Sequence, residues 1–246
     1  MRLHRLGIDR SGAAKVRRGI LEQALPPQLV AEIVVGVAEA GLELDRVLEA
    51  VRLRCPDDLD FQHEIEKHRA DEEKHYRMFR RWFERAGKMP LQFDRGVGHI
   101  DRFIQWVFRC PIEELDTAAI LSDPREFERL CRVIMLTEQR GLAQVEILLR
   151  NRAVRSDPVM SRIFAIIHAD EPDHFLPYQR WLERPGRATA RWNERAADWC
   201  IHKVLMLVKL PALFLDAGCE RLERWPDQQA PVALAETGIA ALPIAA

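Results

Sequence analysis

Two copies of the pattern Asp-Glu-x-x-His contain the side chains of this chain best suited to chemistry. They span Asp71–His75 and Asp170–His174, and the repeat extends without a gap over residues 69–88 and 168–187, at a constant offset of 99 positions. Residues three apart on a helix share a face, with about 5–6 Å between their Cβ atoms. A Glu and a His at this spacing can therefore direct an oxygen and a nitrogen at one metal ion. The motifs offer four such ligands: Glu72, His75, Glu171 and His174.

Two further glutamates precede the motifs at matching distances. Glu39 lies 33 residues before Glu72, and Glu138 lies 33 residues before Glu171. Both fall within long helical patterns, where a buried acid costs free energy unless it is paired or bound to a metal. Glu43, one turn after Glu39, is the alternative ligand on the first helix.

With this order of ligands, the chain resembles the ferritin-like di-iron (di-metal) carboxylate superfamily over about residues 28–185. The Asp before each Glu makes it similar to the oxygenase and hydroxylase members. The resemblance implies an all-α fold: a ferritin-like four-helix bundle with a long crossover between helices two and three, plus additional C-terminal helices. It implies two iron ions as cofactor, or a manganese–iron pair. The implied metal ligands are Glu39, Glu72, His75, Glu138, Glu171 and His174.

Four residues beside the motifs could support the site. Asp71 and Asp170 each lie four residues before a motif histidine. Each could orient an imidazole by accepting its other N–H, or could form a salt bridge at the surface. His68 and His168 precede the motif glutamates by about one turn. They could be extra ligands, and an ordinary hydrogen-bonded histidine is the simpler interpretation of each.

Helix-start and helix-stop residues divide the chain into long helices. Pro172 and Pro177 lie inside the last of these, so we expect a local 3₁₀ or π distortion near residues 167–173. Gly141, close to Glu138, could open space for substrate or oxygen, or could only allow close helix packing. Long helices are expected at 28–54, 59–86 (ended by Gly87), about 123–152 (begun by Asp123-Pro124) and 156–185, with short helices at 99–109 and 112–121 in the crossover.

The chain is expected to have four segments. They are a basic N-terminal arm or short helix at 1–27, the ferritin-like bundle at 28–186, additional helices at 187–225 and a flexible tail at 226–246. Within the third segment, residues 200–215 are apolar nearly all round. This stretch could pack on the core, form a homodimer contact or touch a membrane or a lipid-like substrate.

Composition predicts a cytoplasmic globular protein. Apolar residues make up 48% of the chain and charged residues 30%, and the net charge of −1 gives no field that would attract nucleic acid. The five cysteines form no CxxC pair, which favours reduced thiols. The sequence has neither an apolar run of about 18 residues nor the apolar core of a secretory signal.

The expected function is that of a non-haem di-iron oxidoreductase, a monooxygenase or hydroxylase that activates O2 to oxidise an organic substrate, which could be apolar. Electrons would come from a separate reductase, because no flavin, nucleotide or iron–sulfur motif is visible. One alternative is a ferroxidase or iron-handling protein without an organic substrate. Another is a helical module without metal, in which the six ligand positions would not converge.

Overall fold

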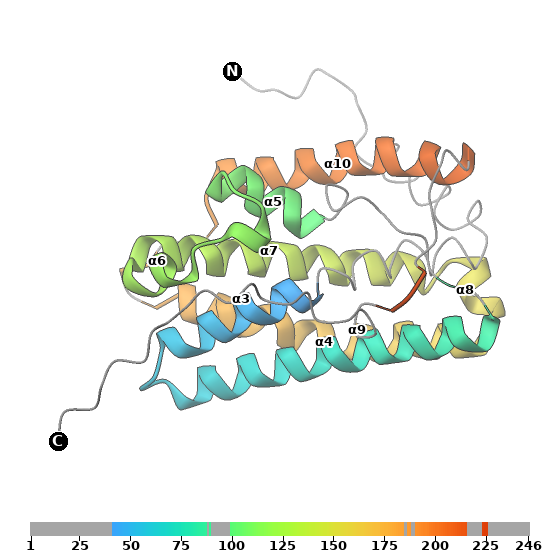
Figure 1. The fold of residues 1–246 in the computed structure, drawn as a ribbon, viewed down its shortest axis with the longest axis horizontal. Coiled ribbons are helices and arrows are strands. Elements are labelled where there is room, and N and C mark those ends of the chain that lie inside the picture. The colour runs from blue at the N-terminus through green and yellow to red at the C-terminus, as the bar shows by residue number, and fades with distance from the viewer. Residues whose placement is uncertain are drawn as a thin grey trace, which may run out of the picture.

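A computed structural model of the chain describes residues 41–87, 89, 99–184, 186–187, 190–215 and 223–225. Within these residues the protein is all-α, with eight α-helices, one 3₁₀ helix and no strand (Figure 1). This confirms the all-α class. The expected arm at 1–27, the tail at 226–246 and the candidate ligand Glu39 lie outside the described residues. Only the backbone is described for residues 41–44, 99, 101 and 205–215.

Four helices lie side by side along the long axis of the molecule: α3 (Gly41–Arg54), α4 (Leu59–Ala86), α7 (Pro124–Leu148) and α9 (Pro158–Leu182) (Figure 1). Helix α9 contacts both α4 and α7, and α3 packs against α4. None of the helices within the described ranges is long and apolar enough to cross a membrane.

Side-chain caps set the ends of these helices, several at the predicted residues. Asp58 accepts a hydrogen bond from the N–H of Phe61 at the start of α4, and Gly87 ends that helix with a φ of 63°. Asp123 caps α7, with Pro124 as its first residue. Helix α7 ends before the predicted residue 152, because the Asn151 side chain caps a new short helix, α8 (Arg152–Ser156).

The predicted distortion near residues 167–173 was wrong. Helix α9 is α-helical throughout, with Pro172 and Pro177 inside it. Each proline removes one backbone hydrogen bond. The buried side chains of Ile167, Glu171 and His174 anchor the helix on both sides of Pro172, so the packing of this face outweighs that local loss.

Short helices connect α4 to α7. Helix α5 (His99–Phe108) is followed by the 3₁₀ helix η2 (Ile112–Glu114) and by α6 (Thr117–Ser122). Arg46 of α3 holds this connection in place by donating to the backbone oxygens of Ile112 and Leu115. The last helix within the described residues, α10 (Trp192–Leu215), packs on α5 and α7.

The core consists of two apolar clusters separated by a polar level. The first cluster includes Phe61, Leu130 and Tyr178, and the second includes Phe79, Val145 and Phe164. On each of α4, α7 and α9, the stretch between the two clusters carries buried acids or histidines. The sequence thus places the polar residues of three helices at one level, with apolar packing on either side.

Candidate metal centre

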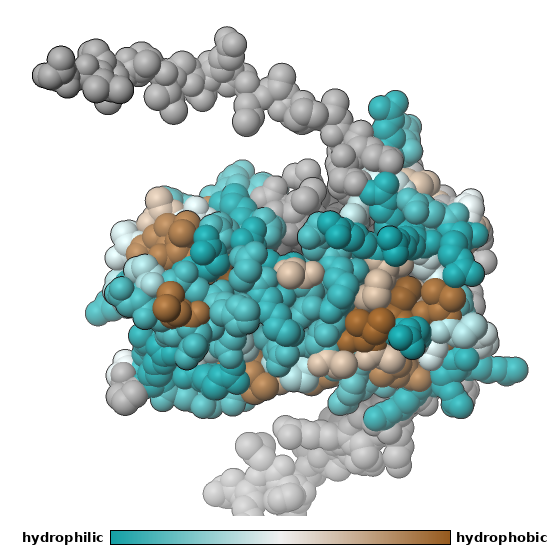
Figure 2. All heavy atoms as spheres, turned by 90° about the horizontal axis from the view of Figure 1, so that it is seen from below, coloured by the Kyte–Doolittle hydropathy of each residue, from teal (hydrophilic) through white to brown (hydrophobic). Residues whose placement is uncertain are grey.

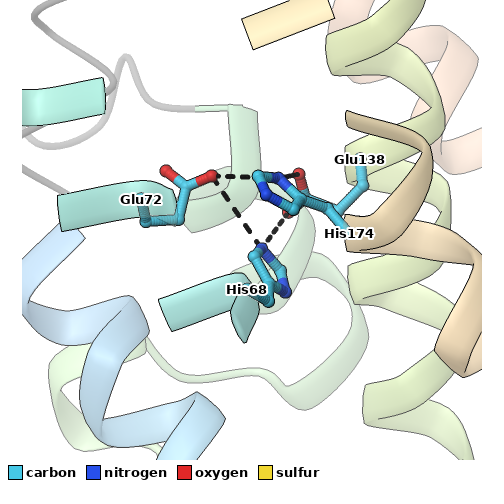
Figure 3. A group of neighbouring side chains, drawn as sticks. All are labelled: His68, Glu72, Glu138 and His174. Carbon is cyan, nitrogen blue, oxygen red and sulfur yellow. Dashed lines mark ion pairs between the residues drawn. The ribbon is translucent and has the colours of Figure 1, made fainter. Parts of the chain in front are cut away.

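Four side chains from three helices meet at this polar level. Nitrogen or oxygen atoms of His68, Glu72, Glu138 and His174 all lie within 4.8 Å of one another (Figure 3). Helix α4 supplies the first two residues, α7 the third and α9 the fourth. Metal–ligand bonds to histidine and carboxylate are about 2.0–2.2 Å, so atoms facing each other across one ion are about 4 Å apart. The group therefore has the dimensions of a single metal site.

The Oε1 atom of Glu72 lies at the centre of the histidines. It is 3.3 Å from Nδ1 of His174, 3.8 Å from Nδ1 of His75 and 3.9 Å from Nε2 of His68. Glu138 closes the group from the opposite side, at 3.9 Å from both His68 and His174. Figure 3 shows the ring of His174 between the two carboxylates.

Of the predicted ligands, the structure brings Glu72, Glu138 and His174 into this group. His75 lies beside it, facing Glu72 through Nδ1. The fifth, Glu171, lies beside Gly141 on the neighbouring helix: a Cβ atom added to that glycine would lie 3.1 Å from the Oε2 atom of Glu171. The side chains of Glu39 and Glu43 lie outside what the structure describes.

The two histidines considered as extra ligands differ. His68 belongs to the group, is 1% exposed and stacks on His174 with 4.2 Å between the ring centroids. Its Nδ1 atom lies 3.4 Å from the hydroxyl of the buried Tyr178. His168 is half-buried on α9 and is not a member. The sequence signal for His68 is that it lies one turn before Glu72, on the same face of α4.

The motif aspartates support the histidines across the two repeats. The Oδ2 atom of Asp170 on α9 lies 2.9 Å from Nε2 of His75 on α4. In the reciprocal pair, Oδ2 of Asp71 on α4 lies 3.6 Å from Nε2 of His174 on α9. An ionised carboxylate can only accept, so the Nε2 atom of His75 carries the proton and its Nδ1 lone pair faces the site.

Two lysines, which the sequence interpretation did not single out, hold these aspartates. Lys74 pairs with both Asp71 and Asp170, the second at 2.8 Å. Lys67 lies 2.9 Å from both Asp71 and Asp173. Burial opposes ionisation of Asp71, but hydrogen bonds from the two lysines outweigh it and lower its pKa to about 2. The i, i+4 spacing from Lys67 to Asp71 was the available signal.

The acids inside the site repel one another. Burial, and then the negative charge of Glu72, raises the pKa of Glu171 to about 8. Burial also raises the pKa of Glu138 well above its ordinary value, followed by the charges of Glu171 and Glu72. Burial opposes ionisation of Glu72 as well, but the neighbouring imidazoles of His174 and His75 outweigh it and lower the pKa of Glu72. Burial, followed by His174, lowers the pKa of His68 to about 3.

Several buried polar atoms at this level have no hydrogen-bond partner. They are Nε2 of His68, both ring nitrogens of His174 and Oε2 of Glu171. A buried polar atom left unpaired costs about 1–3 kcal/mol, so such atoms rarely gather in one place without a reason. A cation between them would accept their lone pairs and offset the repulsion of the carboxylates. The residues present therefore fit a bound metal.

The chain was compared with protein-family models, with curated proteins and with solved structures, and nothing matches in any of the three comparisons.

Proposed function

We propose that the protein is a ferritin-like di-metal carboxylate protein, with iron as its metal, and that it uses O2 to oxidise an organic substrate. The supporting observation is that three glutamates and three histidines from α4, α7 and α9 converge, and that buried ring nitrogens of His68 and His174 and an oxygen of Glu171 have no hydrogen-bond partner. Two Glu-x-x-His helices facing each other, with a further Glu from each of two other helices, is the arrangement of ferritin-like carboxylate sites.

The donor set supports the choice of metal. Mixed imidazole and carboxylate ligands suit iron and manganese, and the absence of thiolate from the group argues against a soft-metal site. His68, Glu72, Glu138 and His174 would hold one ion. His75 and Glu171 would contribute to a second ion, and Glu39 or Glu43 would supply the remaining carboxylate. A manganese–iron pair would use the same ligands.

The chemistry of the proposed activity sets the roles of the protein groups. Bound iron would supply the redox chemistry. O2 would take two electrons from the substrate and two from a separate reductase, one oxygen atom would enter the substrate, and the other would leave as water with two protons. Asp170 and Asp71 would hold the imidazoles of His75 and His174 with Nδ1 towards the ions. The two apolar clusters would keep bulk water away from the polar level.

The decisive experiment is the metal content of the full chain expressed with iron. We expect about two iron ions per chain in the wild type, as in other carboxylate sites of this architecture, and large losses in Glu72→Ala and Glu171→Ala. Glu73→Ala and Asp173→Ala are matched controls, because these acids neighbour the ligands in sequence but are exposed. They should keep the metal. A folded wild type that takes up no iron would refute the proposal.

Oxygen consumption then separates the two iron-dependent activities. An oxygenase should consume O2 continuously when a reductase and an organic substrate are supplied. A ferroxidase should consume O2 in proportion to the Fe(II) added and stop when it is exhausted. The second result would keep the metal site and replace the oxygenase assignment.

A further inference from the structure

One face of α10 exposes large apolar and basic side chains together. Trp192 is 82% exposed, and Trp199 and Val204 are each 57% exposed. Arg195 is also exposed, and the Lys203 ammonium lies 5.6 Å from the centroid of the Trp199 ring. Trp192, Arg195, Trp199 and Lys203 follow one another at spacings of three and four, so they form a single stripe along the helix, and Val204 directly follows Lys203 in the sequence.

The acids of the same helix point the other way. Between residues 192 and 204 the only acids are Glu194 and Asp198, which are both buried. Glu194 pairs with Arg132 of α7 at 2.8 Å, and Asp198 pairs with Arg140 of α7. The exposed stripe over these residues therefore contains tryptophan and basic residues with no carboxylate.

The position of α10 leaves this stripe accessible. Figure 1 shows α10 along one outer edge of the molecule, with α5 and α7 on its inner side. The face around α4 differs: Figure 2 shows it covered mainly by hydrophilic residues, with apolar groups in separate places.

We propose that the outer face of α10 is a docking surface for an anionic lipid bilayer. A helix with Trp on its exposed face and Lys or Arg beside it lies in the plane of the membrane interface, where the indole rings settle at headgroup level. The basic residues add attraction to negatively charged headgroups. Glu194 and Asp198 pair with arginines of α7, so their negative charges do not face the bilayer, which would repel them.

The charge of the stripe also disfavours a second copy of this chain as the occupant. In a two-fold dimer the same patch meets itself. Contact through this face would then bring Arg195 of both protomers into one interface, and the stripe has no exposed carboxylate to pair with these two side chains. A negatively charged surface meets the same residues without that repulsion.

Sedimentation of the full chain with lipid vesicles tests the proposal. We expect binding to vesicles of phosphatidylcholine mixed with phosphatidylglycerol, weak binding to phosphatidylcholine alone, and release by salt. Trp192→Ser/Trp199→Ser should weaken the partitioning by tenfold or more. Arg195→Gln/Lys203→Gln should weaken it by about tenfold on the anionic vesicles only. All four residues are at least partly exposed, so circular dichroism of the variants should match the wild type.

Matched controls come from elsewhere on the surface. Leu59 is 74% exposed at the start of α4, and Arg77 and Arg81 are exposed later on that helix. Leu59→Ser and Arg77→Gln/Arg81→Gln should bind as the wild type does. Three results would overturn the proposal: no vesicle binding, equal loss in the control and α10 variants, or a dimer abolished by the α10 variants in a protein that does not bind vesicles.

Discussion

The carboxylate of Asp170 lies 2.9 Å from the imidazole of His75, so the acid of the second repeat supports the histidine of the first. From the sequence, each aspartate could orient an imidazole or form a salt bridge at the surface. The structure crosses the two repeats, with Asp71 facing His174 in the same way. Each half of the internal repeat therefore depends on the other for the orientation of its ligand.

This crossing predicts the effect of Asp170→Asn. An amide can no longer hold His75 as strongly as an ionised carboxylate does, so we expect metal affinity to fall by about tenfold to a hundredfold. Asp173→Asn is the control, because Asp173 lies on the same helix but contacts only the exposed Lys67. Competition with a chelator measures the metal affinity of both variants. Equal affinities of the two variants would show that Asp170 does not position a ligand.

Gly141 predicts a conflict between helix stability and the site. Alanine normally stabilises a helix relative to glycine by about 1 kcal/mol. Here its Cβ atom would lie 3.1 and 3.2 Å from the two Glu171 oxygens, so Gly141→Ala should displace that carboxylate and weaken metal binding. In a Glu171→Ala background the same change should recover its ordinary stabilising effect. Denaturant unfolding of the wild type, the two single variants and the double variant measures the effect of Gly141→Ala on stability in each background. The same effect in both backgrounds would contradict this prediction.

The shifted pKa values predict how the stability of the metal-free protein changes with pH. The pKa of Glu171 is about 8 in the folded state against an ordinary 4.5, so between these values the folded protein binds more protons than the unfolded chain. Stability must then fall as pH rises. His68, with its pKa lowered to about 3 from 6.5, has the opposite effect only below pH 6.5.

The clearest window is therefore pH 6.5 to 8. We expect the free energy of unfolding to fall there by about 1 kcal/mol per pH unit for each carboxyl group with a raised pKa. Glu171→Gln should therefore reduce the slope by about that amount, and Glu138, whose pKa is also raised, should keep the remainder. Urea unfolding of chelator-treated protein at several pH values measures it. A wild-type slope that survives in Glu171→Gln would assign the effect to other groups.

The buried pair of Arg132 and Glu194 predicts how firmly α10 is attached. Both side chains are nearly inaccessible, and Nε of Arg132 lies 2.8 Å from a Glu194 oxygen. Glu194→Ala should cost about 3 kcal/mol, because the buried guanidinium would keep only the more distant carboxylate of Glu128, at 3.7 Å. Glu126→Ala breaks the more exposed pair with Arg129 and should cost less than about 1 kcal/mol. Thermal unfolding compares the stability of the two variants, and similar losses of stability would contradict the expectation.

The sequence predicted the helices well where their ends are set by local chemistry. The helix predicted at 59–86 has the bounds of α4, because Asp58 caps its start, Gly87 caps its end, and both residues can be recognised from the neighbouring sequence alone. The end of α7 was missed, because a side chain three residues beyond it, Asn151, begins another helix. The predicted distortion at Pro172 failed because burial of the surrounding face, which depends on other helices, decides the local geometry.

The internal repeat of the sequence made part of the candidate site predictable. The spacing identified Glu72, His75, Glu138, Glu171 and His174, which lie in or beside the group that the structure brings together. Spacing along one helix cannot show which side chains meet across two. The pairing of Asp170 with His75 and the contact of Tyr178 with His68 span 95 and 110 residues, so they follow only from the way α9 packs on α4.

The polar level between the two apolar clusters also has a kinetic consequence. The pairs that orient its histidines join residues about a hundred positions apart, so forming them requires closure of nearly half the chain. A nascent chain in which α9 has not yet been synthesised has the site residues of α4 and α7 but lacks His174 and Asp170. Metal capture should therefore follow the docking of α4 and α9, and an ion bound there would report that the whole helical core has folded.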